Sequence, residues 1–240
     1  MLKRMKLPIL CYHKVGPLTK EGRGLNVEPE TLSHQIQFFK KRGYQFIKAS
    51  ELQKSWPKRA ICLTFDDGYL STLTYGVETL KKHQVTATIY VVPAYVGENS
   101  SWKNAAPRPL ASWELLKDAR LQGIEISNHT YTHPYLSELS LEEQIKEISL
   151  AHQALKKHGF CSESFCFPYG FFNEQTLQAM QQTSYKIGLG LSRRRATPKD
   201  NPLALPRIVI RNSDKLPLLL YTLYLRPHLH HFHKRPHYIP

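Results

Sequence analysis

The chain has 240 residues and a formal net charge of +14, with 33 lysines and arginines against 19 acidic residues. Its length fits one domain with a sizeable core, and its 41% hydrophobic and 22% charged residues exclude a disordered chain. No apolar run approaches the roughly 20 residues that a membrane-spanning helix needs. The excess positive charge predicts an anionic partner, such as a membrane surface, a nucleic acid or an acidic glycan.

The start of the chain has part of the pattern of an export signal. Basic residues precede an apolar run after Lys6, but the run is short and no small-residue cleavage site follows it. We therefore expect a protein of the cytoplasm or of the cytoplasmic face of the inner membrane. The four cysteines form no CxxC pair and lie in or near apolar segments. They predict buried thiols, and their even number leaves disulfides open.

Short apolar runs alternate with segments of helical periodicity along the chain. Several runs are continuous, which is typical of parallel strands buried on both faces. The predicted strands are 7–12, 45–47, 60–65, 86–92, 124–127, 164–167, 186–191 and 205–211, and the predicted helices are 30–42, 70–83, 113–122, 141–158, 173–183 and 214–225. The helix after Ser140 begins with a capping box formed by Ser140 and Glu143, and Gly159 ends it.

Repeated strand–helix units predict an α/β fold, either a (β/α) barrel or an open doubly wound sheet. We favour a deformed or incomplete barrel of seven to eight strands, because no glycine-rich dinucleotide loop follows the first strand. The main domain is predicted over residues 1–212, and a last helix with a basic, histidine-rich tail over residues 213–240. Functional side chains of such a barrel lie at the carboxyl ends of its strands.

The positive charge is concentrated near the end of the chain. Residues 193–240 hold ten lysines and arginines but only two acidic residues, a net charge of +8. The apolar part of residues 214–225 is either the last barrel helix, which we favour, or a segment lying in a membrane interface beside lipid phosphates. No combined basic and aromatic module supports nucleic-acid binding, so no such partner is expected.

Two adjacent carboxylates, in Thr64-Phe-Asp-Asp-Gly68, follow the predicted strand 60–65. Like charges this close resist joint ionisation. A metal ion relieves the repulsion by binding one carboxylate, and the other remains as a candidate base. Asp-Asp-Gly is also a common turn sequence, so this motif alone leaves both interpretations open.

Two histidines four residues apart, in His129-Thr-Tyr-Thr-His133, follow another predicted strand. Such a pair can converge on one ion, although a chain with twelve histidines also produces this spacing by chance. Together with one aspartate they would form a three-ligand site with positions open for water, which suits metal-assisted hydrolysis.

Two further segments end predicted strands on the same side of the barrel. Phe167-Pro-Tyr-Gly170 predicts a sharp turn that either aims a backbone N–H into the site or is an ordinary strand–helix turn. Cys11-Tyr-His-Lys14 ends the first strand and brings His13 to this side.

In this order, the segments Thr64–Gly68, His129–His133 and Phe167–Gly170 resemble the motifs of the polysaccharide deacetylase family, also called the NodB homology domain or carbohydrate esterase family 4. The early segment Pro8–His13 resembles the branch that includes the poly-N-acetylglucosamine deacetylases of biofilm formation. The resemblance runs from about Leu7 to Arg211. It implies a deformed (β/α) barrel, a divalent metal and hydrolysis of an N-acetyl group, or of an O-acetyl or formyl group, on a sugar.

The resemblance also implies a role for each motif residue. Asp67, His129 and His133 would bind the metal, which is usually zinc, with Co²⁺, Ni²⁺, Mn²⁺ or Fe²⁺ as alternatives. Asp66 would be the general base that deprotonates the attacking water, and His13 would protonate the departing amine. The turn at Pro168 and Tyr169 would contribute the backbone N–H of Tyr169 to the oxyanion.

The chain departs from the family pattern at several positions. Typical members open the third motif with an arginine that tunes the base, whereas this chain has Cys166 there. Arg207 on the last predicted strand is our candidate for a replacement, its alternative being an exposed strand end. The usual Asp-Trp motif is not visible, and Trp113 lies too early to belong to it. The late Leu-x-His motif has only tail candidates, namely His228, His230, His231, His233 and His237.

These observations predict a metal-dependent hydrolase that removes N-acetyl groups from an amino sugar in a cell-surface polysaccharide or its lipid-linked precursor. A deformylase or a non-sugar amide hydrolase on the same fold is the alternative within the enzymes. A catalytically silent module that binds a glycan or a membrane is the alternative outside them. The complete set of acids and histidines argues against that module, which has no need of a free base beside a metal.

Overall fold

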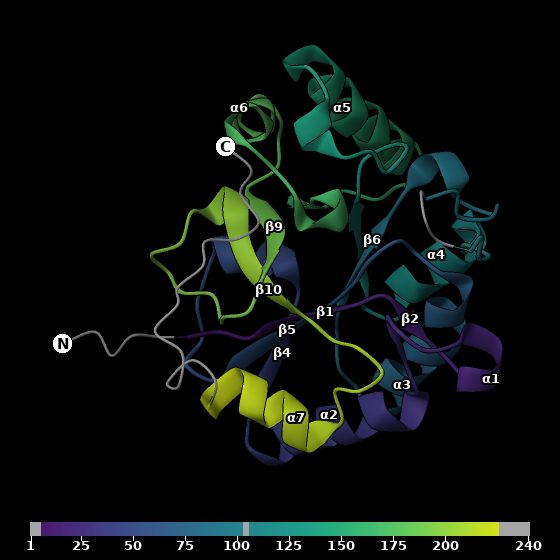
Figure 1. Ribbon diagram of the computed structural model, residues 1–240, viewed down its shortest axis with the longest axis vertical. Coiled ribbons are helices and arrows are strands. Elements are labelled where there is room, and N and C mark those ends of the chain that lie inside the picture. Colours follow the sequence, from purple (N-terminus) through teal and green to yellow (C-terminus); the bar gives the residue numbers. More distant parts are fainter. Residues whose placement is uncertain (1–5, 103–105, 226–240) are drawn as a thin grey trace.

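A computed structural model of the chain describes residues 6–102 and 106–225. Among these residues, seven parallel strands close into a barrel in the order β1-β5-β6-β7-β8-β9-β10, and β10 pairs again with β1 (Figure 1). The strands are β1 (Ile9–Tyr12), β5 (Ala60–Phe65), β6 (Thr88–Val91), β7 (Glu125–Asn128), β8 (Ser164–Cys166), β9 (Ile187–Ser192) and β10 (Leu205–Val209). The expected barrel is confirmed, and the ring is closed rather than incomplete.

Three further strands lie outside the barrel ring. β4 (Gln45–Ile47) pairs in parallel with the first half of β5, and β2 (Lys14–Val15) pairs with β3 (Asn26–Val27) in a separate small sheet. The small sheet is too short to be recognised from hydrophobic periodicity. It follows His13 directly and shapes the chain next to the carboxyl end of β1.

Helices surround the barrel in the positions expected for repeated strand–helix units (Figure 1). The α-helices are α1 (Leu18–Glu21), α2 (Pro29–Lys41), α3 (Val77–Lys82), α4 (Trp113–Leu121), α5 (Leu141–Lys157), α6 (Glu174–Gln181) and α7 (Leu216–Leu220). Short 3-10 turns are η1 (Ala49–Gln53), η3 (Pro93–Tyr95), η4 (Leu136–Glu138), η5 (Pro168–Gly170) and η6 (Pro202–Ala204), and π turns are η2 (Thr72–Gly76) and η7 (Tyr221–Leu225). The predicted capping box of α5 is present, since Ser140 and Glu143 bond reciprocally.

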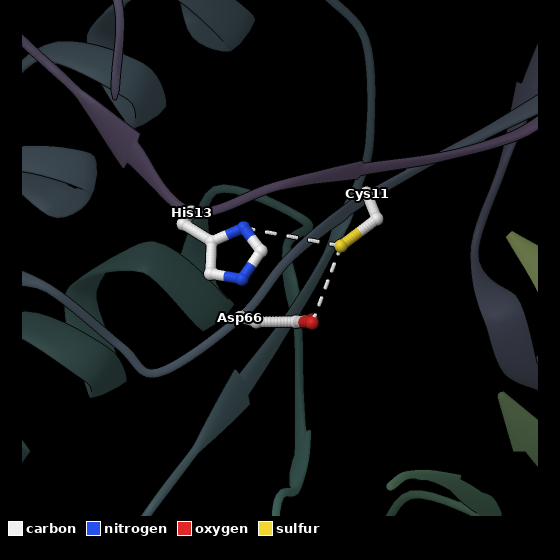
Figure 2. Close-up of side chains that lie close together, drawn as sticks. All are labelled: Cys11, His13 and Asp66. Atoms are coloured by element: carbon white, nitrogen blue, oxygen red, sulfur yellow. Dashed lines mark hydrogen bonds between the residues drawn. The ribbon is translucent and has the colours of Figure 1, made fainter. Parts of the chain in front are cut away.

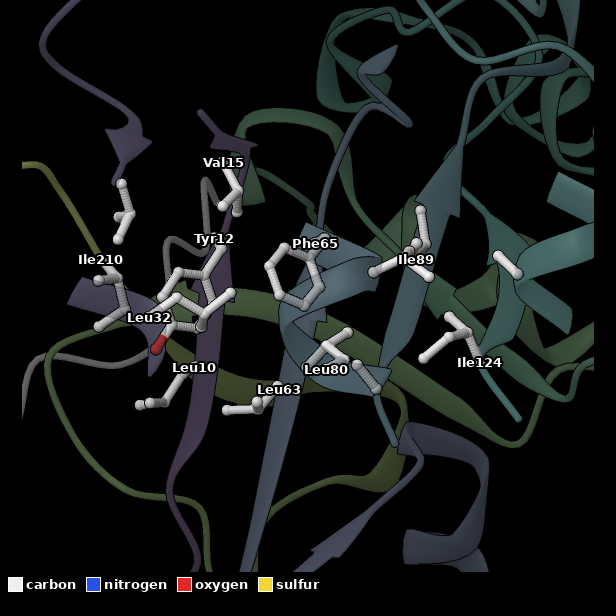
Figure 3. Close-up of a cluster of buried hydrophobic side chains, with 14 of the residues drawn as sticks. Leu10, Tyr12, Val15, Leu32, Leu63, Phe65, Leu80, Ile89, Ile124 and Ile210 are labelled. Carbon is white, nitrogen blue, oxygen red and sulfur yellow. The ribbon is translucent and has the colours of Figure 1, made fainter. Parts of the chain in front are cut away.

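The main hydrophobic core lies between the barrel and its helices (Figure 3). Leu10 and Tyr12 on β1 face this layer, where Tyr12 stacks on Phe65 with 5.1 Å between ring centroids. Ile9 belongs instead to the cluster that fills the barrel interior. This alternation is the period-2 pattern of a strand buried on both faces, and it points Cys11, like Ile9, into the barrel.

The last described helix belongs to the outer layer of the barrel. Leu219 and Leu223 are buried in the main core, and the Tyr224 hydroxyl lies 2.7 Å from that of Tyr44 after α2. Leu218 and Leu225 stay exposed. The basic tail over residues 226–240, with its five histidines, lies outside the described residues. Within the part of the chain that is described, no helix has the length and apolar character needed to cross a membrane.

All four cysteines are free thiols. Cys11, Cys62 and Cys166 are buried as expected, but the expectation was wrong for Cys161, which is exposed. Cys161 lies in the connection between α5 and β8, where the chain crosses the surface. Its apolar neighbour Phe160 takes the buried position instead.

Candidate active site

The carboxyl ends of several barrel strands bring the predicted residues together. Asp66 and Asp67 follow β5, His129 follows β7, and the η5 turn with Tyr169 follows β8. His13 follows β1 on the same side. Parallel strands place all their carboxyl ends at one edge of the barrel, so residues that are far apart in the sequence meet there.

One carboxylate oxygen lies between the two predicted histidine ligands. Asp67 Oδ1 is 3.4 Å from His129 Nε2 and 3.3 Å from His133 Nε2. The three residues are 4%, 1% and 6% exposed, so their donor atoms converge in a nearly closed space. Asp67 has a φ of 72°, a left-handed conformation that is uncommon for a residue other than glycine.

A backbone contact orients the ring of His129. Its Nδ1 lies 2.9 Å from the carbonyl oxygen of Cys166, and a carbonyl can only accept, so Nδ1 carries the proton. Nε2 is then the ring nitrogen that faces Asp67. Metal-ligating histidines typically have such a partner for the other ring nitrogen.

The ring of His133 is held by aromatic packing. It stacks on Trp102 at 4.3 Å between centroids, and the ring of Tyr169 meets it edge-on at 4.6 Å. Its Nδ1 is buried and has no hydrogen-bond partner among the described residues. Burial lowers the pKa of His133 despite the neighbouring Asp67, which favours the neutral imidazole that can bind a metal.

These three residues fit a divalent metal. One carboxylate and two imidazoles, each with a ligand atom within 4.8 Å of the others, form a donor set typical of zinc and similar ions. Burial would raise the pKa of Asp67, but the hydrogen bonds from His129 and His133, together with the electrostatic effect of the nearby histidines, hold the pKa well below its usual range. The carboxylate is therefore ready as a ligand.

Asp66 is held by an ion pair with Arg207. Arg207 Nη1 donates to Oδ1 at 2.6 Å and Nη2 donates to Oδ2 at 2.7 Å, and both residues are buried. The guanidinium also donates to Thr64 Oγ1 at 3.0 Å. Burial would raise the pKa of Asp66, but the charge and hydrogen bonds of Arg207, together with the neighbouring His129, hold the pKa well below its usual range. Arg207 thus faces the carboxylate from β10 and is not an exposed strand end.

Two thiols complete the surroundings of Asp66, and sequence analysis had given neither a role. Cys11 Sγ donates to Asp66 Oδ2 at 3.3 Å, and Cys166 Sγ does so at 3.6 Å. Figure 2 shows the Cys11 thiol between Asp66 and His13, whose Nδ1 is 4.0 Å from the sulfur. Side chains alternate between the two faces of β1, so Cys11, two residues before His13, was expected on the same face as His13. This alternation could have identified Cys11 as a neighbour of the site.

The turn at Pro168 and Tyr169 has an unusual backbone. Tyr169 adopts φ 58° and ψ 0°, and Gly170 follows with φ 75°. A side chain at position 170 would meet Leu191, since a Cβ there would lie 2.4 Å from its Cγ. The ring of Tyr169 stacks on Tyr135 at 3.9 Å. The turn is closed by two backbone hydrogen bonds, from the Gly170 N–H to the Phe167 carbonyl at 2.9 Å and from the Phe171 N–H to the Pro168 carbonyl at 3.2 Å.

Sequence analysis also missed Trp102 and Tyr69 at this site. The Trp102 indole donates to the Tyr69 hydroxyl at 3.1 Å, and both rings pack in a small cluster beside His133. Trp102 lies in a long connection without periodicity. The rarity of tryptophan, with three in the chain, was the one sequence feature that could have indicated a role for it. Trp113 lies elsewhere, stacked on His158.

Comparisons with known proteins point to one family. The model of the polysaccharide deacetylase family matches residues 53–188. YxkH of Bacillus subtilis, whose name assigns it to the polysaccharide deacetylases, is 27% identical over 214 residues, which is 86% of this chain and 72% of YxkH. A poly-beta-1,6-N-acetyl-D-glucosamine N-deacetylase of Staphylococcus aureus is 25% identical over 210 residues, which is 81% of this chain and 71% of that protein.

Solved structures share the fold. The Streptococcus pyogenes deacetylase PplD, in complex with acetate, has a TM-score of 0.78 and 27% identity, covering 92% of this chain and 99% of its own. IcaB of Ammonifex degensii has a TM-score of 0.75 over 89% of this chain and 95% of its own, and at 23% identity this likeness concerns the fold alone. The chain belongs to the polysaccharide deacetylase family, hydrolases that cleave the N-acetyl amide bonds of polysaccharides.

Proposed function

We propose that the protein is a metal-dependent N-deacetylase that acts on an amino sugar of a cell-surface polysaccharide or of its lipid-linked precursor. The observation that carries the proposal is that two adjacent carboxylates have different partners. Asp67 lies against His129 and His133, whereas Asp66 lies against Arg207. One acid can therefore bind a metal while its neighbour handles a proton.

Asp67, His129 and His133 would hold the ion. A bound divalent ion would polarise the amide carbonyl and lower the pKa of the attacking water. Zn²⁺ suits this donor set best, and Co²⁺, Ni²⁺, Mn²⁺ or Fe²⁺ can use the same ligands. The chemistry needs ligands that are already deprotonated, and the buried Asp67 and His133 both favour that state.

Asp66 would take the proton of the water, as the general base. Its ion pair with Arg207 keeps it ionised and fixes both of its oxygens. A carboxylate held in this way is a weak base, which suffices for a water whose own pKa is lowered. Arg207 therefore tunes and positions Asp66 from β10, in the place of the arginine that the third motif lacks.

His13 would protonate the departing amine. Its ring is half-buried, and one of its nitrogens lies within 4.8 Å of Asp66 and Cys11. The N–H of Tyr169, in the left-handed turn after Pro168, would stabilise the developing oxyanion from the carboxyl end of β8. The two groups thus serve the leaving nitrogen and the carbonyl oxygen, respectively.

The glycan is proposed from the relatives and not from a pocket. The Staphylococcus aureus relative is named for poly-beta-1,6-N-acetyl-D-glucosamine, so a polymer of N-acetylated hexosamines is the first substrate class to test. We further propose that the protein works in the cytoplasm or on the cytoplasmic membrane face. Leu218 and Leu225 are exposed, and basic residues follow them in the sequence, which supports a proposal of peripheral membrane contact.

The test combines metal analysis with acetate release. The purified protein is assayed on β-1,6-linked and β-1,4-linked N-acetylglucosamine oligomers and on N-formylated counterparts. Asp66→Asn should lower turnover at least about 100-fold, in the range of general-base contributions, while the metal content stays. His129→Ala should lose both metal and turnover.

The outcomes separate the alternatives. Formate release without acetate release would identify a deformylase, and turnover of simple amides alone would identify a non-sugar amide hydrolase. Glycan binding without turnover would support a silent module. Absence of any divalent ion after metal loading would overturn the mechanism.

A further inference from the structure

The segment between the two histidine ligands has a costly backbone. Thr130 has a φ of 66° and His133 a φ of 65°, and neither is a glycine. Residues in this left-handed region are uncommon, and they persist where surrounding contacts over-determine them. The backbone path that joins the two histidines therefore depends on the contacts that fix residues 130–132.

Glu147 on α5 fixes the middle of this segment. Its Oε2 accepts the backbone N–H of Tyr131 at 2.9 Å and that of Thr132 at 2.8 Å. Its Oε1 accepts the Thr132 hydroxyl at 2.8 Å. One carboxylate thus receives three hydrogen bonds from two consecutive residues that lie between the ligands.

Other contacts fix the two ends of the segment and one carbonyl in its middle. Asn128 Oδ1 accepts the N–H of Thr130 at 2.7 Å, and Thr130 Oγ1 accepts the N–H of His133 at 3.1 Å. Asn128 is itself held by the Tyr185 hydroxyl and the Ile148 carbonyl. The carbonyl of Tyr131 accepts from Ala94, but its N–H depends on Glu147.

The helix that carries Glu147 is firmly placed. Ile148, the neighbour of Glu147 on α5, is fully buried, and so is Ala151 one turn further along the helix. A charged acceptor on a fixed helix binds backbone N–H groups more strongly than a neutral one. Loss of the carboxylate would leave both N–H groups to solvent and release the left-handed turn.

We propose that Glu147 is a positioning residue that sets the geometry of the His129 and His133 ligand pair. Glu147 contacts neither the substrate nor the reacting atoms. It acts through the backbone of the connecting segment, as outer residues of metal sites do when they orient ligands. This inference rests on the metal site of the proposed function.

The test compares Glu147→Ala and Glu147→Gln with the wild-type chain. Glu143→Ala is the matched control, since Glu143 lies on the same helix and its carboxylate bonds to Ser140 at the helix start, away from the histidine segment. Zn²⁺ affinity is measured by competition with a chromophoric chelator, and ligand geometry by the visible absorption of the Co²⁺-loaded protein. Thermal unfolding and amide hydrogen exchange of Tyr131 and Thr132 are measured on the metal-free proteins.

We expect Glu147→Ala to weaken Zn²⁺ binding about 10-fold or more, to alter the Co²⁺ spectrum and to speed exchange at both amides. Glu147→Gln keeps an acceptor of the same shape and should recover most of the affinity. The Glu143→Ala control should bind Zn²⁺ like the wild type. If Glu147→Ala does not fold, the Glu147→Gln exchange rates and affinity decide.

Wild-type affinity and spectrum in Glu147→Ala, or equal losses in the Glu143→Ala control, would overturn the positioning role and leave the metal site standing. Failure of the wild-type chain itself to bind Zn²⁺ or Co²⁺ would overturn the proposed function and this inference with it. The two failures are therefore distinguishable.

Discussion

Arg207 on β10 donates hydrogen bonds to both carboxylate oxygens of Asp66, which follows β5, at 2.6 and 2.7 Å inside the barrel. The two residues are 141 positions apart in the sequence. Their pairing exists only because the barrel closes β10 against β1 and β1 against β5. The candidate base and the closure of the fold are therefore linked.

Arg207→Met should destabilise the protein strongly. It leaves a buried carboxylate without its partner, and removal of one member of a buried pair costs about 3–5 kcal/mol. The free energy of unfolding is measured by urea denaturation at pH 7 on metal-free protein. Lys215→Met, which removes the half-exposed pair with Glu28, should cost less than about 1 kcal/mol.

A double variant separates the charge from the packing. Arg207→Met combined with Asp66→Asn removes the unpaired charge and should recover part of the loss. A cost for Arg207→Met no larger than that of Lys215→Met would show that the pair contributes little.

Stability should fall in acid through Asp66. Its pKa is lowered in the folded protein, so its contribution is complete above the unfolded value of about 3.9 and is lost as the pH falls toward the folded value. The free energy of unfolding, measured from pH 6 to pH 2, should drop below about pH 5. Asp66→Asn should flatten this dependence, while Asp67 still contributes in both proteins. Equal slopes for the two proteins would contradict the prediction.

One thiol should react in the native protein. Cys161 is exposed, whereas burial raises the pKa of Cys11, Cys62 and Cys166 and shields their sulfurs from reagent. Titration with a chromogenic disulfide should give one thiol per chain under native conditions and four in denaturant. Cys161→Ser should abolish the native signal. Rapid reaction of a second thiol would show that the surroundings of Asp66 are open to solvent.

Gly170→Ala should damage the turn that carries Tyr169. The new Cβ would meet Leu191, and φ at this position is 75°. Gly97→Ala is the matched control, since its φ is 86° but nothing lies within 4 Å of a Cβ there. We expect Gly170→Ala to cost about 1–3 kcal/mol more than the control, the typical cost of overpacking.

Activity should separate the same two variants. A small displacement of a catalytic group can cost about 100-fold in rate, so acetate release should fall by that order in Gly170→Ala and little in Gly97→Ala. Equal activity in both variants would remove the turn from the mechanism.

Local sequence signals predicted the strands well. The run Ala60–Phe65 is continuous and apolar, and β5 has those bounds. The sequence also placed each motif directly after a predicted strand. Because parallel strands share one carboxyl edge, it followed that the motifs would meet there. The capping box at Ser140 was equally local, since it needs only residues three apart.

The contacts between distant strands could not be predicted in the same way. Cys11 meets Asp66 across 55 positions, and that distance depends on how the closed barrel staggers its strands. Trp102 reaches His133 from an irregular connection, whose path no periodicity encodes. Arg207 was predicted as a candidate, but its two hydrogen bonds with Asp66 depend on the closure of the barrel and could not be predicted.

The backbone and the side chain of Cys166 serve different neighbours. Its carbonyl accepts from His129, while its thiol lies against Asp66 and Arg207. A substitution at this position can therefore change the partner of the base and leave the orientation of the metal ligand untouched. Because a backbone carbonyl orients His129, this contact does not require a particular side chain at position 166. The arginine that typical family members have at this position can therefore be replaced by one on another strand, such as Arg207 on β10, without loss of the contact to His129.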